Sequence, residues 1–192
     1  RTDTPIIVMY VGQLYQGQGI KGLLNALAKV PSVRLEILGG KTDEIKAFKN
    51  YASILGVLDR VCFHGFCSPA KLSSMVLHTD AFIAPFEAIG RMPYVAHTKL
   101  LEYASWGRPV IAPDMPVVRE HFPDGKGVLL FESGSVRGLA ESLLKMCNPS
   151  IREKLQREAS KNVRSFNWKE RSMCYSEILK NCVKKKSVHR WQ

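Results

Sequence analysis

Lys99 and Glu102 stand three residues apart in the stretch HTKLLEYASWGRPVIAPD, whose pattern predicts a helix followed by a buried strand. An ion pair on a solvated helix face would explain them, at about 0.2–0.5 kcal/mol. Two features argue against that explanation. A lysine in the first helical turn opposes the helix dipole unless an anion lies nearby, and lysine before glutamate is the weaker order for a pair. Because residues that break a local rule are candidates for function, this pair is a candidate for a functional role.

The elements that must position this pair follow a regular alternation. Six short apolar runs alternate with amphipathic, helix-like segments such as IKGLLNALAKV and AKLSSMVLH. This order predicts an α/β fold with a doubly wound, parallel, six-stranded, Rossmann-like sheet. The runs are IIVMYVG, VRLEILGG, VCFHGF, AFIAPF, RPVIAP and GVLLF.

Helix boundaries are marked by capping residues. Ser68-Pro69 and Ser135 are predicted to open helices, and Gly107 to close the helix that carries Lys99. Beyond Pro149 two additional C-terminal helices are expected, over about residues 150–186, with a break at 166–168. Neither a repeat nor an interior linker is visible in the sequence, so residues 1–192 are predicted to form one domain.

Ligands of open parallel sheets bind outside the carboxyl ends of the strands, so the loops after the apolar runs are the expected place for a site. The first loop is glycine-rich, with Gly12, Gly17 and Gly19. The third is the tight turn at Gly65-Phe66, and the fourth is a long loop that ends at Lys99. Converging loops of this kind fit a nucleoside diphosphate, because a carboxylate accepts ribose hydroxyls while a lysine and helix amides face the phosphates.

The order of motifs is similar to that of a known enzyme family. YVGQLYQGQGIKGLLNAL, LEILGG, VCFHGF, KLLEYASWGRPVIAPD and NWKER follow one another along the chain. The sequence resembles the C-terminal, donor-binding domain of GT-B glycosyltransferases. More narrowly, it resembles the group-1 family of retaining enzymes, which transfer sugars from nucleotide-activated donors. The resemblance covers nearly the whole chain, and KLLEYASWGRPVIA is its most specific part.

The resemblance implies roles for particular residues. Glu102 would hold the donor ribose, Lys99 and the amides around Thr98 would lie near the diphosphate, and the Gly12-Gln13 turn would close on it. The Gly65-Phe66 turn would lie against the base. The family requires no bound metal or other cofactor, because helix amides and basic side chains offset the charge of the leaving diphosphate. No cluster with metal-ligand spacing is visible in the sequence either.

The sequence departs from the family pattern in two places. Where many members carry Arg and Lys after the first strand, the corresponding residues are Gln13 and Gln18, and Lys21, Lys99 or Arg91 would have to supply the charge. The paired glutamates of the family, spaced E-x7-E, are incomplete, because the earlier position is Tyr94. Glu87, in the same loop, is the one candidate catalytic residue, and HTKLLE resembles a lysine-containing variant of the motif.

The positions of five other residues, two histidines, two tryptophans and one aspartate, indicate their roles. His64 is expected to be a strand-end residue, and His97 is either a phosphate contact or a packing residue. Asp114 is expected to cap the next short helix. Trp106 and Trp168 are expected to pack as core or hinge residues.

The net charge of +11 is concentrated at one end of the chain. From Lys145 onward there are thirteen Lys/Arg against four Asp/Glu, which leaves only +2 for everything before. Solvated helix faces would explain this excess. Docking of the basic end, including Lys184–Lys186 and Trp191, on an anionic membrane surface is the alternative. Nucleic acid is not an expected partner, because aromatic residues are not interleaved with the charges.

Cysteine usage and hydropathy bear on location. The five cysteines are odd in number and lack C-x-x-C spacing, which favours buried free thiols in a reducing compartment. Since no apolar run approaches the length of a membrane span, a cytoplasmic protein is expected, with peripheral attachment to the cytosolic membrane face as an extension.

The sequence thus predicts the donor-binding half of a retaining, hexosyltransferase-like enzyme. The acceptor half would be an N-terminal domain that this chain does not contain, so the segment alone would bind a nucleotide sugar and transfer little. Two alternatives stay open. The fold also serves sugar-nucleotide epimerases, and the two glutamines are compatible with a non-catalytic, nucleotide-sugar-binding or scaffolding domain.

Overall fold

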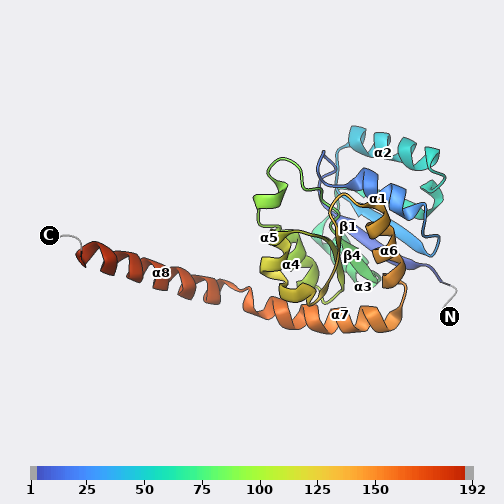
Figure 1. Ribbon diagram of the computed structural model, residues 1–192. Helices are drawn as coiled ribbons and strands as arrows, with labels where there is room; N and C mark the ends of the chain where they lie inside the picture. Colours follow the sequence, from blue (N-terminus) through green and yellow to red (C-terminus); the bar gives the residue numbers. More distant parts are fainter. Residues whose placement is uncertain (1–3, 189–192) are drawn as a thin grey trace.

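The predicted fold class is confirmed. The computed structural model describes residues 4–188, with every side chain there except those of Asp124 and residues 184–188. Six parallel strands form one sheet in the order β3-β2-β1-β4-β5-β6 (Figure 1). The strands are β1 Ile6–Val11, β2 Val33–Leu38, β3 Val61–Gly65, β4 Ala81–Ile83, β5 Val110–Asp114 and β6 Val128–Glu132.

Helices connect the strands and continue beyond the last one. The connections also include the short 3-10 turns η1 Leu58–Arg60, η2 Met92–Tyr94, η3 Pro123–Gly125 and η4 Val163–Ser165. The α-helices are α1 Ile20–Leu27, α2 Thr42–Ile54, α3 Pro69–Leu77, α4 Thr98–Ser105, α5 Pro116–His121, α6 Val136–Met146, α7 Pro149–Asn162 and α8 Trp168–Val188.

The sheet is covered on both faces. Alternate side chains of β1 point to opposite sides: Val8 and Tyr10 belong to one core cluster and Met9 to the other. The first cluster packs under α1, α2 and α6, and the second under α3, α4 and α5. This two-sided burial is why the central strands β1, β4 and β5 are nearly continuous apolar runs, whereas β2 and β3, toward the edge of the sheet, carry polar residues.

The strand order creates a topological switch point between β1 and β4. From β1 the chain moves outward through β2 to β3, then returns to the other side of β1 as β4. The loops that follow β1 and β4 meet there closely. A Cβ at Gly19 would lie 1.8 Å from the carbonyl oxygen of Pro85, and the amide of Glu87 donates to the carbonyl of Gly17 at 2.9 Å. In open parallel sheets this is the position where ligands bind.

Most predicted helix caps are confirmed, and one is wrong. The hydroxyls of Ser68 and Ser135 accept hydrogen bonds from amides at the starts of α3 and α6, and Gly107 follows α4 with φ 68°. Asp114 does not cap α5, whose N-cap is Met115. Its carboxylate instead accepts two hydrogen bonds from Arg119, at 2.6 and 2.7 Å, which holds the pKa of Asp114 below its usual value. A two-pronged guanidinium contact is a stronger partner than a single amide.

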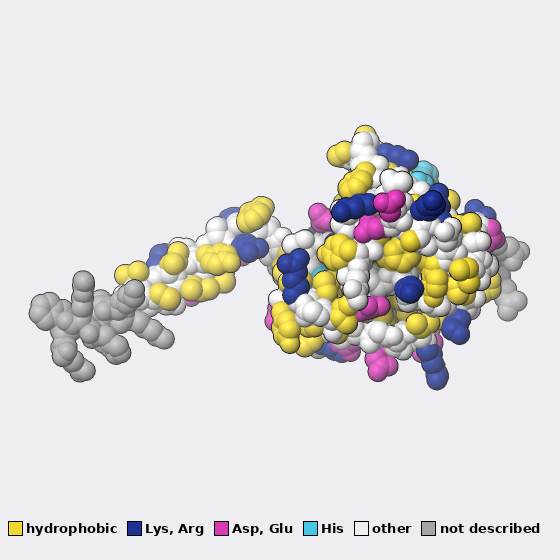
Figure 2. Space-filling view, turned by 90° about the horizontal axis from the view of Figure 1, so that it is seen from above, with side chains coloured by type: hydrophobic (Ala, Val, Ile, Leu, Met, Phe, Trp, Pro, Cys, Tyr) yellow, Lys and Arg dark blue, Asp and Glu magenta, His cyan; other side chains and the backbone are white. Residues whose placement is uncertain are grey.

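The predicted break between the last two helices is confirmed, and α8 leads away from the body of the domain (Figure 1). Every side chain from Arg164 to Val183 is exposed, and both hydrophobic and basic side chains lie open along α8 (Figure 2). Trp106 packs against Phe82 and Tyr103, as predicted. For Trp168 the core half of the prediction is wrong, because 82% of its surface is exposed, but its position at the start of α8, directly after the break, matches the hinge half.

The membrane-docking alternative stays a prediction. Lys184, Lys185 and Lys186 lie within α8, but the structure describes only their backbone. Trp191 lies outside the described residues. Among residues 4–188, none of the helices combines the length and the apolar character needed to cross a bilayer.

The cysteine prediction is correct in part. All five cysteines are free thiols, but none of them is buried. Cys62, Cys174 and Cys182 are exposed, and Cys67 and Cys147 are half-buried. The sequence pattern misplaced them because three of them lie on an edge strand or on the protruding helix α8.

The close packing of α7 against the start of β6 leads to a first prediction. Gly127 and Gly134 both have left-handed backbone conformations, with φ 83° and 79°, but an added Cβ would meet different surroundings. At Gly127 it would lie 2.5 Å from the backbone of Ala159 in α7, whereas at Gly134 no atom of the described residues lies within 4 Å. We expect Gly134→Ala to lower the free energy of unfolding by about 1 kcal/mol through backbone strain alone. Gly127→Ala should cost about 1–3 kcal/mol more, because α7 must move.

Denaturant titration of the two variants beside the unchanged chain measures both costs. Equal destabilisation by the two substitutions would contradict this description of how α7 packs.

Candidate functional site

The candidate site is built around the side chain of Lys99 at the start of α4. Its half-buried ammonium group lies directly against the backbone at the end of β1. A Cβ added at Gly12 would come within 2.7 Å of Lys99 Nζ and 2.9 Å of the Tyr10 hydroxyl. A side chain at position 12 would therefore push the amine out of this position, and the lysine sits at the switch point of the sheet.

Two buried groups hold this lysine in place. Lys99 Nζ donates a hydrogen bond of 2.9 Å to Gln18 Oε1 and a longer one of 3.4 Å to the Tyr10 hydroxyl. The same ammonium group lies over the Tyr10 ring, 4.8 Å from its centroid. The Tyr10 hydroxyl is in turn 2.8 Å from Gln18 Oε1 and 2.5 Å from the Gln13 carbonyl oxygen. These contacts tie α4 to the loop after β1 by side chains eighty or more residues apart.

The environment makes Lys99 an unusually ready anion binder. Burial lowers its pKa to about 8, and the negative charge of Glu102 opposes part of that decrease. At neutral pH the amine is still mostly protonated, but it is poorly solvated. A cation that has already lost hydration gains more from an arriving anion than a fully hydrated one does.

Gln18 has a role that sequence reasoning missed. Its side chain is only 4% exposed, and its amide oxygen accepts a hydrogen bond that orients Lys99. The glutamine is therefore more than a missing basic residue. Lys21 lies on the exposed side of α1, with its amine over the Tyr51 ring, and Arg91 is exposed in the loop before η2. Of the three basic residues considered to supply charge, Lys99 is therefore the one that the structure holds in the site. A glutamine in a glycine-rich turn gives no sequence signal of this task.

A small cavity shares Gly12 with the cluster around Lys99. It has a volume of about 150 Å³ and opens between the loops that follow β1, β2 and β3. Gly12, Gln13 and Phe66 all line it, so three of the predicted binding residues are brought together. A hydrogen bond of 2.6 Å from the amide of Gly39 to the carbonyl of Gly65 joins two of the loops. The lining residues are Val11, Gly12, Gln13, Leu38, Gly39, Phe66, Cys67 and Leu72.

The mostly apolar lining of this cavity suits the flat, largely apolar face of a base. Phe66 is 75% exposed, so its ring is available to cover a ligand at the rim. A larger hollow of about 450 Å³ lies along α7, but it shares no residue with the cluster at Lys99 and is lined mainly by long charged side chains. We therefore place the candidate site at the smaller cavity.

The remaining predicted binding residues differ in exposure and in their contacts. Thr98 and Glu102 are exposed on α4. Thr98 directly precedes Lys99, and Glu102 follows it by about one helical turn. His97 is 8% exposed, its ring stacks on Phe86 with centroids 3.7 Å apart, and its Nε2 donates to the Met92 carbonyl at 2.9 Å. Burial lowers the pKa of His97, which favours the neutral ring. The geometry therefore favours packing over phosphate contact for this histidine.

Glu87 lies in the loop after β4, where its backbone supports the glycine turn that follows β1. His64 ends β3, as predicted, and contacts Glu36 on the neighbouring strand. The positions of both residues match the sequence analysis, while a catalytic role for Glu87 stays a prediction.

Comparison with known proteins places this chain in a family. The family model described as "Glycosyl transferases group 1" matches residues 1–166. Among curated proteins, the chain is 28% identical over 197 residues to a Bacillus subtilis (strain 168) protein named "Putative glycosyltransferase EpsD", covering 97% of this chain and 49% of that protein. It is 25% identical over 146 residues to the lipopolysaccharide core biosynthesis glycosyltransferase LpsE of Rhizobium meliloti (strain 1021), covering 74% and 41%.

Solved structures show the same fold. The chain superimposes on Anabaena Alr3699/HepE, solved in complex with UDP, with a TM-score of 0.77 and 21% identity, over 93% of this chain and 49% of that one. Like the curated relatives it matches, that protein is about twice the length of the present chain. Since the family model covers most of the sequence, the chain belongs to the group 1 family of glycosyltransferases.

Proposed function

We propose that this chain is the donor-binding half of a glycosyltransferase that moves a sugar from a nucleoside-diphosphate sugar to an acceptor. The observation that carries the proposal is the Lys99 ammonium group, held by Gln18 and Tyr10 against Gly12 at the switch point of the sheet. The base would enter the cavity beside Phe66, the ribose hydroxyls would bind Glu102, and the diphosphate would lie between Lys99 and the Gly12-Gln13 turn.

The finer parts of the proposal concern the chemistry at the leaving group. Retention of the anomeric configuration is expected from the resemblance to retaining enzymes. The reaction would need no metal at the diphosphate, because a preorganised ammonium group and the amides at the start of α4 offset the charge that develops there. Glu87 is the candidate carboxylate at the reacting centre, in a loop already packed on the glycine turn.

The acceptor would bind to a part of the protein that this chain does not include. The chain spans about half the length of the curated relatives it matches, which leaves room for a second domain. In that arrangement the isolated segment binds the donor nucleotide and transfers little sugar. A sugar-nucleotide epimerase or a non-catalytic scaffold would use the same fold, and nucleotide binding separates the scaffold from the other two.

Calorimetric titration with a panel of nucleoside diphosphates tests the proposal. UDP is the first ligand to try, because it is present in the solved Anabaena relative. If Glu102 accepts the ribose hydroxyls, Glu102→Ala should weaken binding by about 1.5–3 kcal/mol, the range of a hydrogen bond to a charged group. This corresponds to roughly 10- to 150-fold in Kd.

Glu141→Ala is the matched control, since Glu141 is an exposed glutamate on α6 with its own partner in Arg137. Unchanged affinity in Glu102→Ala would remove the ribose assignment. Failure of every nucleoside diphosphate to bind the unaltered chain would overturn the donor-binding proposal and favour the scaffold.

The lowered pKa of Lys99 predicts how nucleotide affinity depends on pH. As pH rises through about 8, the free protein loses the proton on Lys99, so affinity for a nucleoside diphosphate should fall above that pH. Affinity for the corresponding nucleoside, which lacks the phosphates, should change little. Lys99→Met should weaken diphosphate binding at pH 7 and remove this part of the pH dependence. A parallel pH profile in the variant would contradict the assignment of Lys99 to the diphosphate.

Lys99 should also make the free energy of unfolding depend on pH, and this quantity should rise with pH where the affinity for the diphosphate falls. Lys99 has a lower pKa when folded than its ordinary 10.5, so the unfolded chain binds more protons between about pH 8 and 10.5. The contribution of Lys99 to stability therefore rises with pH across that window. We expect Lys99→Met to be more stable than the unchanged chain at pH 7 by about 1–3 kcal/mol, with the difference shrinking towards pH 10.5. Denaturant titration at several pH values measures this difference.

A further inference from the structure

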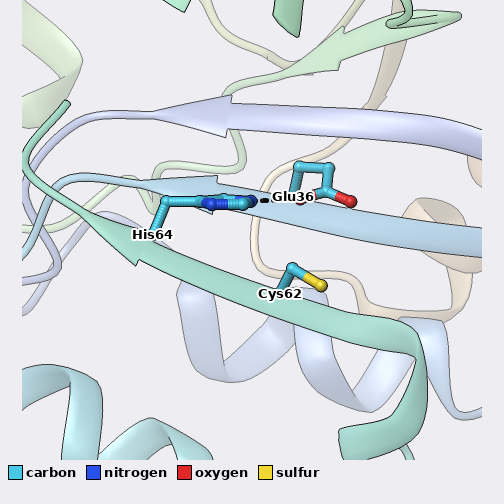
Figure 3. Close-up of side chains that lie close together, drawn as sticks. All are labelled: Glu36, Cys62 and His64. Carbon is cyan, nitrogen blue, oxygen red and sulfur yellow. Dashed lines mark hydrogen bonds and ion pairs between the residues drawn. The ribbon is translucent and has the colours of Figure 1, made fainter. Parts of the chain in front are cut away.

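Three side chains with metal-ligating atoms meet on the outer part of the sheet, apart from the site described above. Glu36 comes from β2, and Cys62 and His64 come from the edge strand β3 (Figure 3). One ligand atom from each, the carboxylate oxygen, the thiol sulfur and an imidazole nitrogen, lies within 4.8 Å of the other two. The three residue types are each common zinc ligands, and here they converge from two adjacent strands.

Strand geometry explains why they converge. Glu36 is the direct partner of Cys62 in the parallel register, and Cys62 and His64 are two residues apart on one strand, so their side chains share a face. The register shifts just beyond: Ile37 pairs with Phe63, but Leu38 pairs with Gly65. His64 is thus the extra residue of a β-bulge, a feature that re-aims side chains. Its Nε2 points at Glu36 Oε2 and contacts it directly.

The accessibility of the cluster suits an incoming ion. Cys62 is exposed, while the side chains of His64 and Glu36 are 23% and 19% exposed. An ion can therefore reach the thiol from solvent, and the other two ligands are sheltered enough to be held in place. Sequence spacing hid the cluster because Glu36 and Cys62 are far apart in the chain and become neighbours only through strand pairing.

We propose that Glu36, Cys62 and His64 form a binding site for a zinc ion. Thiolate, imidazole and carboxylate together match the borderline softness of Zn²⁺ and are a poor set for Mg²⁺ or Ca²⁺, which take oxygen ligands. Three protein ligands leave a fourth tetrahedral position for water. The ion would take the place of the direct contact between His64 and Glu36, with a small separation of the two side chains.

The bound ion would cross-link β2 and β3 at the edge of the sheet. Within residues 4–188, β3 is an edge strand that pairs with β2 alone, so a metal that joins the two strands adds a link where the sheet is least supported. This cross-link would also fix the end of β3 immediately before Gly65 and Phe66. This inference is independent of the proposed function, because none of its three ligands lines the cavity beside Lys99.

Zinc titration of the 192-residue chain tests the proposal. Cys174→Ser and Cys182→Ser are introduced first, because these exposed thiols on α8 could bind metal on their own. In that background we expect one equivalent of Zn²⁺ to bind, Tm to rise with zinc concentration, and Co²⁺ to give a near-ultraviolet thiolate charge-transfer band. Cys62→Ser should abolish the band and weaken zinc binding at least about tenfold.

Two further variants keep the test decisive. Glu36→Gln retains a hydrogen-bond partner for His64 but is a poorer ligand, so it should also weaken zinc binding while the metal-free protein keeps its Tm. Cys147→Ser, in a half-buried thiol outside the cluster, should leave zinc affinity and the cobalt band unchanged. If zinc fails to bind, or if Cys62→Ser and Glu36→Gln bind as tightly as their background, the three residues form only a hydrogen-bonded pair beside a thiol.

Discussion

A cation held out of water at the switch point of the sheet is the constraint on which the rest of the site depends. Burying an ammonium group is costly unless it is hydrogen-bonded, and Lys99 meets that requirement through Gln18 and Tyr10. The arrangement also requires glycine at position 12, since any side chain there would collide with the amine. Three elements, β1, its following loop and α4, are thereby fixed relative to one another by one charge.

The cost of this burial explains the character of the site. A lysine whose pKa is lowered to about 8 destabilises the empty protein and gains from any anion that restores its lost solvation. Stability and binding are therefore opposed at this residue, which is common where a site must be ready before its ligand arrives. Glu102, one helical turn away, moderates the effect by stabilising the charged amine.

Local patterns in the sequence predicted the frame but not the contacts that complete the site. Apolar runs and capping residues such as Ser68 and Ser135 depend on neighbours within a few positions, so the strands and helix ends could be predicted. The roles of Gln18 and the cluster at Cys62 depend on strand and loop pairing over long separations, which periodicity does not report. The capping role predicted for Asp114 and the core alternative for Trp168 are wrong because their surroundings, an available guanidinium and an open helix surface, are tertiary features.

The central claim is that Gln18 and Lys99 act as one unit on the diphosphate. A double-mutant cycle with Gln18→Leu, Lys99→Met and the combined variant, measured as the Kd for UDP at pH 7, tests it directly. Because Gln18 works by orienting the amine, its removal should cost affinity only while Lys99 is present, giving a coupling energy of at least about 1 kcal/mol. Losses that add to within about 0.5 kcal/mol would show that the two residues act independently and would contradict the account.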